Sequence, residues 1–210
     1  MRVFRQIFLF SISLFFLSGC VSTKNFYKEK DTSFFPISTV LENGYNTALY
    51  KAKIDVENNH ISGLIYFKIV SESSYRIIFM SEFGLNLLDY EYKNNSFELI
   101  SCKDFLNKKI ILNAIKNDIK LLIDLPKNND KKSIYKNPKS QISLVKIKEK
   151  LNRYYYFFNQ EKEAIRIIQT KGLKHIEITF DEYDNEIPKK IEIYHKRIKL
   201  GINLNLIKLK

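Results

Sequence analysis

Short stretches in which apolar and polar residues alternate make up most of the chain after residue 50. The clearest is His-Ile-Glu-Ile-Thr-Phe at residues 175–180, in which both isoleucines and the phenylalanine share one face of a strand. Turn formers such as Asn58-Asn59 and Asn94-Asn95 bound these stretches, which predicts successive antiparallel hairpins. Strands are expected over residues 52–56, 61–70, 75–81, 85–92, 97–102, 142–147, 154–158, 164–169, 175–180, 187–195 and 202–210.

One segment has a helical period instead. After Asp104, which can cap a helix, apolar residues recur at spacings of three and four up to Ile123, and Pro126 marks the end. A polar loop is expected over residues 127–141, and a short helix can form over residues 37–50. The pattern therefore predicts an α+β fold, with about eleven antiparallel strands and one long helix packed on the sheet.

The early strands are apolar on both faces. Five of the six residues in Tyr75–Met80 are apolar or aromatic, and residues 61–70 are nearly as mixed, whereas a sheet with one wet face alternates cleanly. Either two ordinary packed layers or an internal cavity for an apolar ligand explains this pattern. Alternation nominates six residues to line such a cavity: Ile65, Phe67, Ile77, Phe79, Leu87 and Tyr156.

The N-terminus has the form of a secretory signal. Arg2 and Arg5 precede an apolar stretch at residues 7–17 that is shorter than the ~20 residues of a spanning helix. It ends in Leu17-Ser18-Gly19-Cys20, which resembles the bacterial lipobox. That resemblance implies cleavage before Cys20 and a covalent diacylglycerol/acyl lipid on this residue, with the thiol made into a diacylglyceryl thioether. Two or more chains hold a protein stably on a membrane.

The chain then divides into a signal peptide at residues 1–19, a lipidated N-terminus and tether at 20–40, and a single domain at 41–210. The formal net charge is +12, from 35 Lys and Arg against 23 Asp and Glu. For an exported lipoprotein, this charge favours an anionic membrane surface over nucleic acid as the partner. An acylated Cys20 leaves Cys102 as the only thiol, so no intrachain disulfide is expected.

No catalytic constellation is visible. His60, His175 and His195 lie far apart, and no zinc motif, nucleophile elbow, P-loop or dinucleotide fingerprint occurs. We therefore expect a protein that is not an enzyme, with no catalytic residues, no metal and no cofactor beyond the covalent lipid.

The order of elements resembles the LolA/LolB family. The residues that carry the resemblance are Ser62-Gly63-Leu64, Tyr75-Arg76-Ile77-Ile78-Phe79 followed by Glu82-Phe83-Gly84, and the hairpin at residues 184–191. It implies a curved antiparallel half-barrel with a helix across its open side and an apolar cavity. It also implies a membrane-facing loop at Phe83 and Gly84, although Glu82 stands where the family has proline.

By this resemblance the protein binds acyl chains, and it accepts lipoproteins from a periplasmic LolA-like carrier and inserts them in the outer membrane, facing the periplasm. Val21 after the cysteine agrees with a location in the outer membrane, because in enteric bacteria Asp at this position marks inner-membrane retention. The alternative is a non-enzymatic envelope scaffold of the same fold with a filled core.

Overall fold

The computed structural model describes residues 25–29, 40–41, 45–56, 58–71, 74–123, 132–184 and 186–210. Among them, thirteen strands form one sheet in the order β1-β7-β8-β9-β10-β11-β12-β13-β2-β3-β4-β5-β6. The strands are β1 (Tyr27–Lys28), β2 (Thr47–Val56), β3 (Asn59–Ser71), β4 (Ser74–Met80), β5 (Asn86–Lys93), β6 (Ser96–Cys102), β7 (Lys132–Lys136), β8 (Ser143–Glu149), β9 (Asn152–Phe158), β10 (Ala164–Lys171), β11 (Lys174–Asp184), β12 (Ile187–His195) and β13 (Leu200–Leu209).

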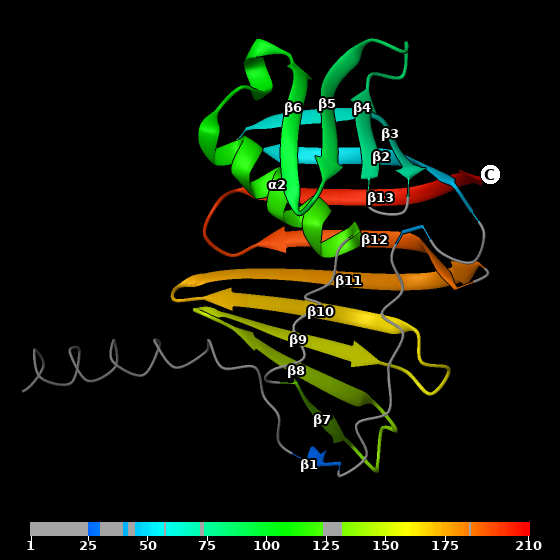
Figure 1. The fold of residues 1–210 in the computed structure, drawn as a ribbon, viewed down its shortest axis with the longest axis vertical. Coiled ribbons are helices and arrows are strands. Elements are labelled where there is room, and N and C mark those ends of the chain that lie inside the picture. The colour runs from blue at the N-terminus through cyan, green and yellow to red at the C-terminus, as the bar shows by residue number, and fades with distance from the viewer. Residues whose placement is uncertain are drawn as a thin grey trace, which may run out of the picture.

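Every neighbouring pair in the sheet is antiparallel, and almost every pair is also consecutive in sequence. The exceptions are the pairing of β1 with β7 and that of the last strand, β13, with β2, in which Ile202 lies opposite Ile54. This closes a continuous meander from β7 to β6. The sheet curves strongly, so that β4 to β6 run steeply across the direction of β2 and β3 (Figure 1). The expected curved antiparallel sheet with one long helix is confirmed.

Helix α2 (Lys109–Ile123) lies across the concave side of the sheet (Figure 1). Its apolar residues recur every three or four positions and eight of its residues are buried, so one face of the helix is covered. A separate 3-10 helix, Asp104–Leu106, precedes it. The predicted single helix from Asp104 is thus interrupted, because Leu106 is fully buried and Asn107 then leaves helical geometry with ψ 46°.

Two segments expected to be irregular contribute strands. Residues 132–136, placed in a polar loop, form β7, because Ile134 is buried in the core. Tyr27–Lys28, in the expected tether, form β1 along the edge of β7, where the amide of Glu29 also donates to the Ile134 carbonyl. Tertiary pairing supplies these strands, which local alternation is too short to show.

The suggested helix over residues 37–50 is wrong where the structure describes it. Residues 47–50 begin β2, and Val40 and Leu41 lie in a bend with their side chains buried. The signal peptide, Cys20 and Pro126 lie outside the described residues. In the described part of the chain, no helix combines the length and the apolar character needed to cross a bilayer.

Candidate functional site

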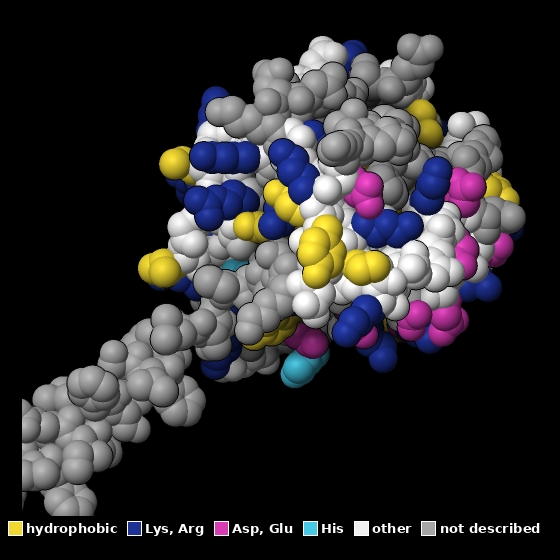
Figure 2. All heavy atoms as spheres, turned by 90° about the horizontal axis from the view of Figure 1, so that it is seen from below, with side chains coloured by type: hydrophobic (Ala, Val, Ile, Leu, Met, Phe, Trp, Pro, Cys, Tyr) yellow, Lys and Arg dark blue, Asp and Glu magenta, His cyan; other side chains and the backbone are white. Residues whose placement is uncertain are grey.

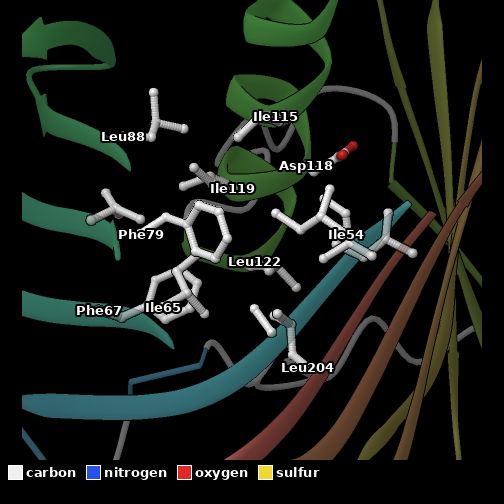
Figure 3. Close-up of a pocket in the computed structure, with 14 residues that line it drawn as sticks. Ile54, Ile65, Phe67, Phe79, Leu88, Ile115, Asp118, Ile119, Leu122 and Leu204 are labelled. Atoms are coloured by element: carbon white, nitrogen blue, oxygen red, sulfur yellow. The ribbon is translucent and has the colours of Figure 1, made fainter. Parts of the chain in front are cut away.

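A small cavity lies between helix α2 and the concave face of the sheet, with a volume of about 30 Å³. Figure 3 shows Ile115, Ile119 and Leu122 of the helix pointing towards Phe67 and Phe79 of the sheet. Thirteen of the fourteen residues around the cavity are apolar, and the exception is Asp118. The lining residues are Ala52, Ile54, Ile65, Phe67, Ile77, Phe79, Leu88, Ile115, Asp118, Ile119, Leu122, Ile193, Ile202 and Leu204.

Strand register brings these residues to one face. Ile65 pairs with Phe79 and Phe67 with Ile77 across β3 and β4, so alternate positions of both strands point inward. The same alternation in β2 and β13 sets Ala52 opposite Leu204. The space left among these side chains, about 30 Å³, is far below the roughly 300–1,000 Å³ of typical ligand pockets.

Four of the six nominated residues, Ile65, Phe67, Ile77 and Phe79, line the cavity. Leu87 is buried but does not line it, and its neighbour Leu88 does. The cause is a β-bulge: Phe79 pairs with Leu88 and Met80 with Asn86, so Leu87 is an extra residue that shifts the alternation by one. A pattern of simple alternation in the sequence cannot reveal such an inserted residue.

Tyr156, the sixth nominated residue, is fully buried in the main core on β9 but is not among the residues around the cavity. Its strand is separated from β2 by four others in the sheet. The aromatic run at residues 154–158 therefore packs the other half of the curved sheet.

Asp118 forms a buried pair with His195, the last residue of β12. Its Oδ2 lies 2.8 Å from Nε2 of His195, and the two side chains are 1% and 6% exposed. Burial raises the pKa of the Asp118 carboxyl to about 6, although the hydrogen bond and charge of His195 act in the opposite direction. The second carboxylate oxygen, Oδ1, is buried without a hydrogen-bond partner among the described residues. This buried polar pair thus joins the helix to the sheet beside an apolar cavity.

A second polar link lies one residue earlier on the helix. Nδ2 of Asn117 donates to Oε1 of Gln169 on β10 over 2.8 Å, and Gln169 in turn lies 3.4 Å from the hydroxyl of Tyr154. Beyond these side chains, the amide of Val40 donates to the Leu122 carbonyl over 3.2 Å. Lys116 and Lys120 of the helix also lie over the rings of Tyr90 and Tyr92, at 5.6 and 5.9 Å from the ring centroids. Apolar packing supplies the other contacts of the helix, and it has no directional preference.

A histidine and an aspartate in contact occur in catalytic triads, where they activate a nucleophile. The residues around this cavity supply no hydroxyl, thiol, amide or second charge besides Asp118 itself. In the part of the chain that the structure describes, no group of three His, Cys, Asp or Glu side chains could hold a metal ion. The arrangement here can bind apolar groups and hold the helix in place.

The sequence contains a signal for this pair that alternation alone did not use. Asp118 lies on the apolar face of the helix, three residues after Ile115 and four before Leu122. His195 continues the inward series Ile191, Ile193 of its strand. A charged residue at a core-facing helix position requires a buried partner, and a core-facing histidine is the natural candidate.

The nominated membrane-facing loop joins β4 to β5. Phe83 is 94% exposed and Leu85 is 64% exposed. Gly84 has φ +81°, and its amide donates to the carbonyl of Ser81, so a tight turn presents the phenyl ring. Glu82 forms an exposed ion pair with Lys51, at 3.2 Å. Glu82 is thus compatible with the turn, and Phe83 lies in solvent.

Comparisons with known proteins give likenesses only at the level of structure. No family model matches the chain, and no curated protein sequence matches it. A LolA superfamily protein from Nitrosomonas europaea is 7% identical with a TM-score of 0.48, over 80% of this chain and 87% of that one. A DUF1329 family protein from Desulfovibrio piger is 10% identical with a TM-score of 0.40, over 80% and 86%. A protein with a YmcC-like fold from Bacteroides fragilis is 12% identical with a TM-score of 0.27, over 84% and 98%.

Proposed function

We propose that this protein is a lipoprotein of the cell envelope, anchored through acyl chains on Cys20, that binds acyl chains between helix α2 and the sheet. The observation that carries the proposal is the lining of the cavity, in which thirteen of fourteen residues are apolar. An acyl chain offers no hydrogen-bond donor or acceptor along its length, so such a lining suits it and discriminates little between chains.

The cavity has a volume of only about 30 Å³, so an acyl chain enters only if the helix moves. The Asp118–His195 and Asn117–Gln169 contacts are two side-chain hydrogen bonds between α2 and the sheet. Breaking these contacts would free the helix to swing away from Phe67 and Phe79, which would then offer their rings to the ligand. In this proposal the helix is a lid, and bound acyl chains replace its apolar contacts.

We propose that the ligand is the lipid of another lipoprotein. Acyl chains on the N-terminal cysteine of another lipoprotein have the same chemistry as those proposed for Cys20, and a LolA-like periplasmic carrier would deliver them. The protein would then insert them in the outer membrane that holds its own anchor, with Phe83 as the first apolar contact to that membrane.

A second candidate function is an envelope scaffold with a filled core. The size of the cavity favours it, because about 30 Å³ leaves the closed form nearly as well packed as an ordinary interior. In that case the polar pair holds the helix permanently, and the protein acts through its surface.

The two candidates differ in lipid binding by the chain from Val21 onward, purified without detergent. Mass spectrometry should find co-purifying lipid, and a fluorescent fatty acid should bind and be displaced by palmitate. Ile119→Phe, which places a ring in the cavity, should weaken binding, whereas Ile110→Phe should not, because Ile110 is 69% exposed on the same helix. A chain that carries no lipid and binds no fatty acid would support the scaffold instead.

A further inference from the structure

Three neighbouring hairpin tips lie together at one end of the sheet. They join β8 to β9, β10 to β11 and β12 to β13, and alternate turns of an antiparallel meander fall at the same end (Figure 1). Register confirms their closeness: Arg153 pairs with Thr170, and the amide of Lys196 donates to the carbonyl of His175 over 3.1 Å.

Two of these tips have the same design. Glu149 pairs with Asn152 and Lys171 with Lys174, so each tip is a two-residue loop, Lys150-Leu151 or Gly172-Leu173. The first loop residue has positive φ in both, 50° at Lys150 and 57° at Gly172. The second is a leucine in both, 77% exposed at Leu151 and 75% at Leu173. Turn geometry favours Gly, Asn or Asp at such positions, so it does not account for two protruding leucines.

Cations surround the leucines. The first hairpin carries exposed Lys148, Lys150 and Arg153, and the second carries Lys171 and Lys174. Lys171 and Lys174 stand directly opposite each other, a like-charge pair that disfavours the hairpin itself.

The third tip adds exposed Lys196, Arg197 and Lys199. Glu149 is the one acidic residue among residues 148–153, 171–174 and 196–199, all of which the structure describes. We call Leu151, Leu173 and these eight cations the basic tip surface.

The turns at the opposite end of the same strands carry acidic residues. The β9–β10 and β11–β12 turns carry Glu161, Glu163, Asp181, Glu182, Asp184 and Glu186. Lysines are mixed among them, and Lys190 pairs with Glu182. Figure 2 shows this separation from below: dark blue side chains with projecting yellow ones gather at the left of the described part, and magenta ones lie mainly towards the right.

We propose that the basic tip surface docks on the surface of an anionic lipid bilayer, with Leu151 and Leu173 inserted among the lipids and the eight cations beside their phosphates. Exposed apolar side chains within a cationic rim match such a surface, whose negative potential attracts nearby Lys and Arg and whose interior accepts leucine. The surface is distinct from the cavity and from the β4–β5 turn with Phe83, and it would set how the domain sits on the membrane.

Tryptophan scanning of the full-length chain reconstituted in vesicles tests this proposal, because the chain contains no tryptophan of its own. Leu151→Trp and Leu173→Trp report on the tips, and Gln160→Trp, at an exposed turn of the opposite end, is the matched control. In vesicles of phosphatidylcholine mixed with phosphatidylglycerol, both tip variants should emit at shorter wavelength and be quenched by brominated acyl chains several-fold more than the control. In phosphatidylcholine alone the difference should shrink.

Charge variants distinguish docking of the basic tip surface from mere nearness to the membrane caused by a lipid anchor. Lys171→Glu and Lys174→Glu, added to Leu173→Trp, should weaken the affinity for the vesicle surface by roughly fivefold for each cation lost. Lys162→Glu at the opposite end, added to the same tryptophan variant, should leave quenching unchanged. Salt should act like the double variant, because screening shortens the reach of the charges.

The proposal would be overturned if Gln160→Trp were quenched as strongly as the two tip variants. It would also be overturned if quenching of the tip variants were the same with and without phosphatidylglycerol. A shift to shorter wavelength in detergent that grows with protein concentration would overturn it in favour of contact between copies of the chain. Circular dichroism shows that each variant is folded, and the two leucines give independent readings. Fatty-acid binding by the cavity is measured separately, so failure of one proposal leaves the other open to its own test.

Discussion

Nε2 of His195 lies 2.8 Å from Oδ2 of Asp118, and this buried contact joins the end of β12 to the middle of α2 across 77 residues of sequence. It places a charged group beside a cavity that is otherwise lined by apolar side chains. Four predictions follow from it and from the strands around it.

Replacing His195 by alanine should lower the free energy of unfolding at neutral pH by about 3–5 kcal/mol, because the Asp118 carboxylate then stays buried without its partner. Urea unfolding measures the loss. The double variant Asp118→Leu with His195→Leu should recover much of it, since an apolar pair suits this interior. A double variant less stable than His195→Ala would contradict the assigned cause.

Replacing Asp118 by asparagine should change how stability depends on pH. Burial raises the pKa of this carboxyl from 3.8 to about 6, so the native state keeps a proton that the unfolded chain releases. The contribution of Asp118 to stability is therefore fully present below pH 3.8 and is lost as pH rises through about 6. Asparagine cannot titrate, so the stability of Asp118→Asn relative to the native chain should rise across that window. The unfolding free energies of both proteins should be measured from pH 4 to pH 7, which reaches roughly one unit beyond the window. If the two values change in parallel with pH, the carboxyl does not titrate there.

Replacing Gly63 by alanine should destabilise the sheet by roughly 1–3 kcal/mol. A Cβ at this position would lie 2.1 Å from the Met80 carbonyl oxygen and 2.9 Å from Cε2 of Phe79, so backbone must shift beside the cavity. Gly201→Ala is the matched control, because its nearest neighbour, the Ile193 carbonyl oxygen, is 4.0 Å away. Thermal unfolding compares the two, and equal melting temperatures would contradict the close approach.

Replacing Phe83 by glutamate should impair transfer of a lipoprotein from a soluble carrier to vesicles and leave the fold intact. The side chain is 94% exposed, so it contributes little to the core. Phe67→Ala is the opposite control: that ring is fully buried, and its loss should cost about 3–5 kcal/mol of stability. A fall in melting temperature for Phe83→Glu as large as for Phe67→Ala would show that the ring is buried.

Local periodicity was enough to predict most elements of the fold. Alternation identified eleven of the strands, and the spacing of Ile115, Ile119 and Leu122 identified the helix face that covers the sheet. It also nominated Ile65, Phe67, Ile77 and Phe79 as neighbours, because residues two apart on paired strands must share a face. These features depend on contacts between residues close in sequence or joined by short turns.

The remaining features depend on partners far apart in the chain. Strands β1 and β7 exist because each pairs with the other or with β8, and the bulge that exchanges Leu87 for Leu88 is set by the register of β4 against β5. Only the tertiary structure brings Asp118 to His195 and closes the cavity to about 30 Å³. The sequence by itself determined which residues avoid water, since that preference belongs to each side chain. Packing decided how much space they leave and which polar group they enclose, because both depend on every neighbour at once.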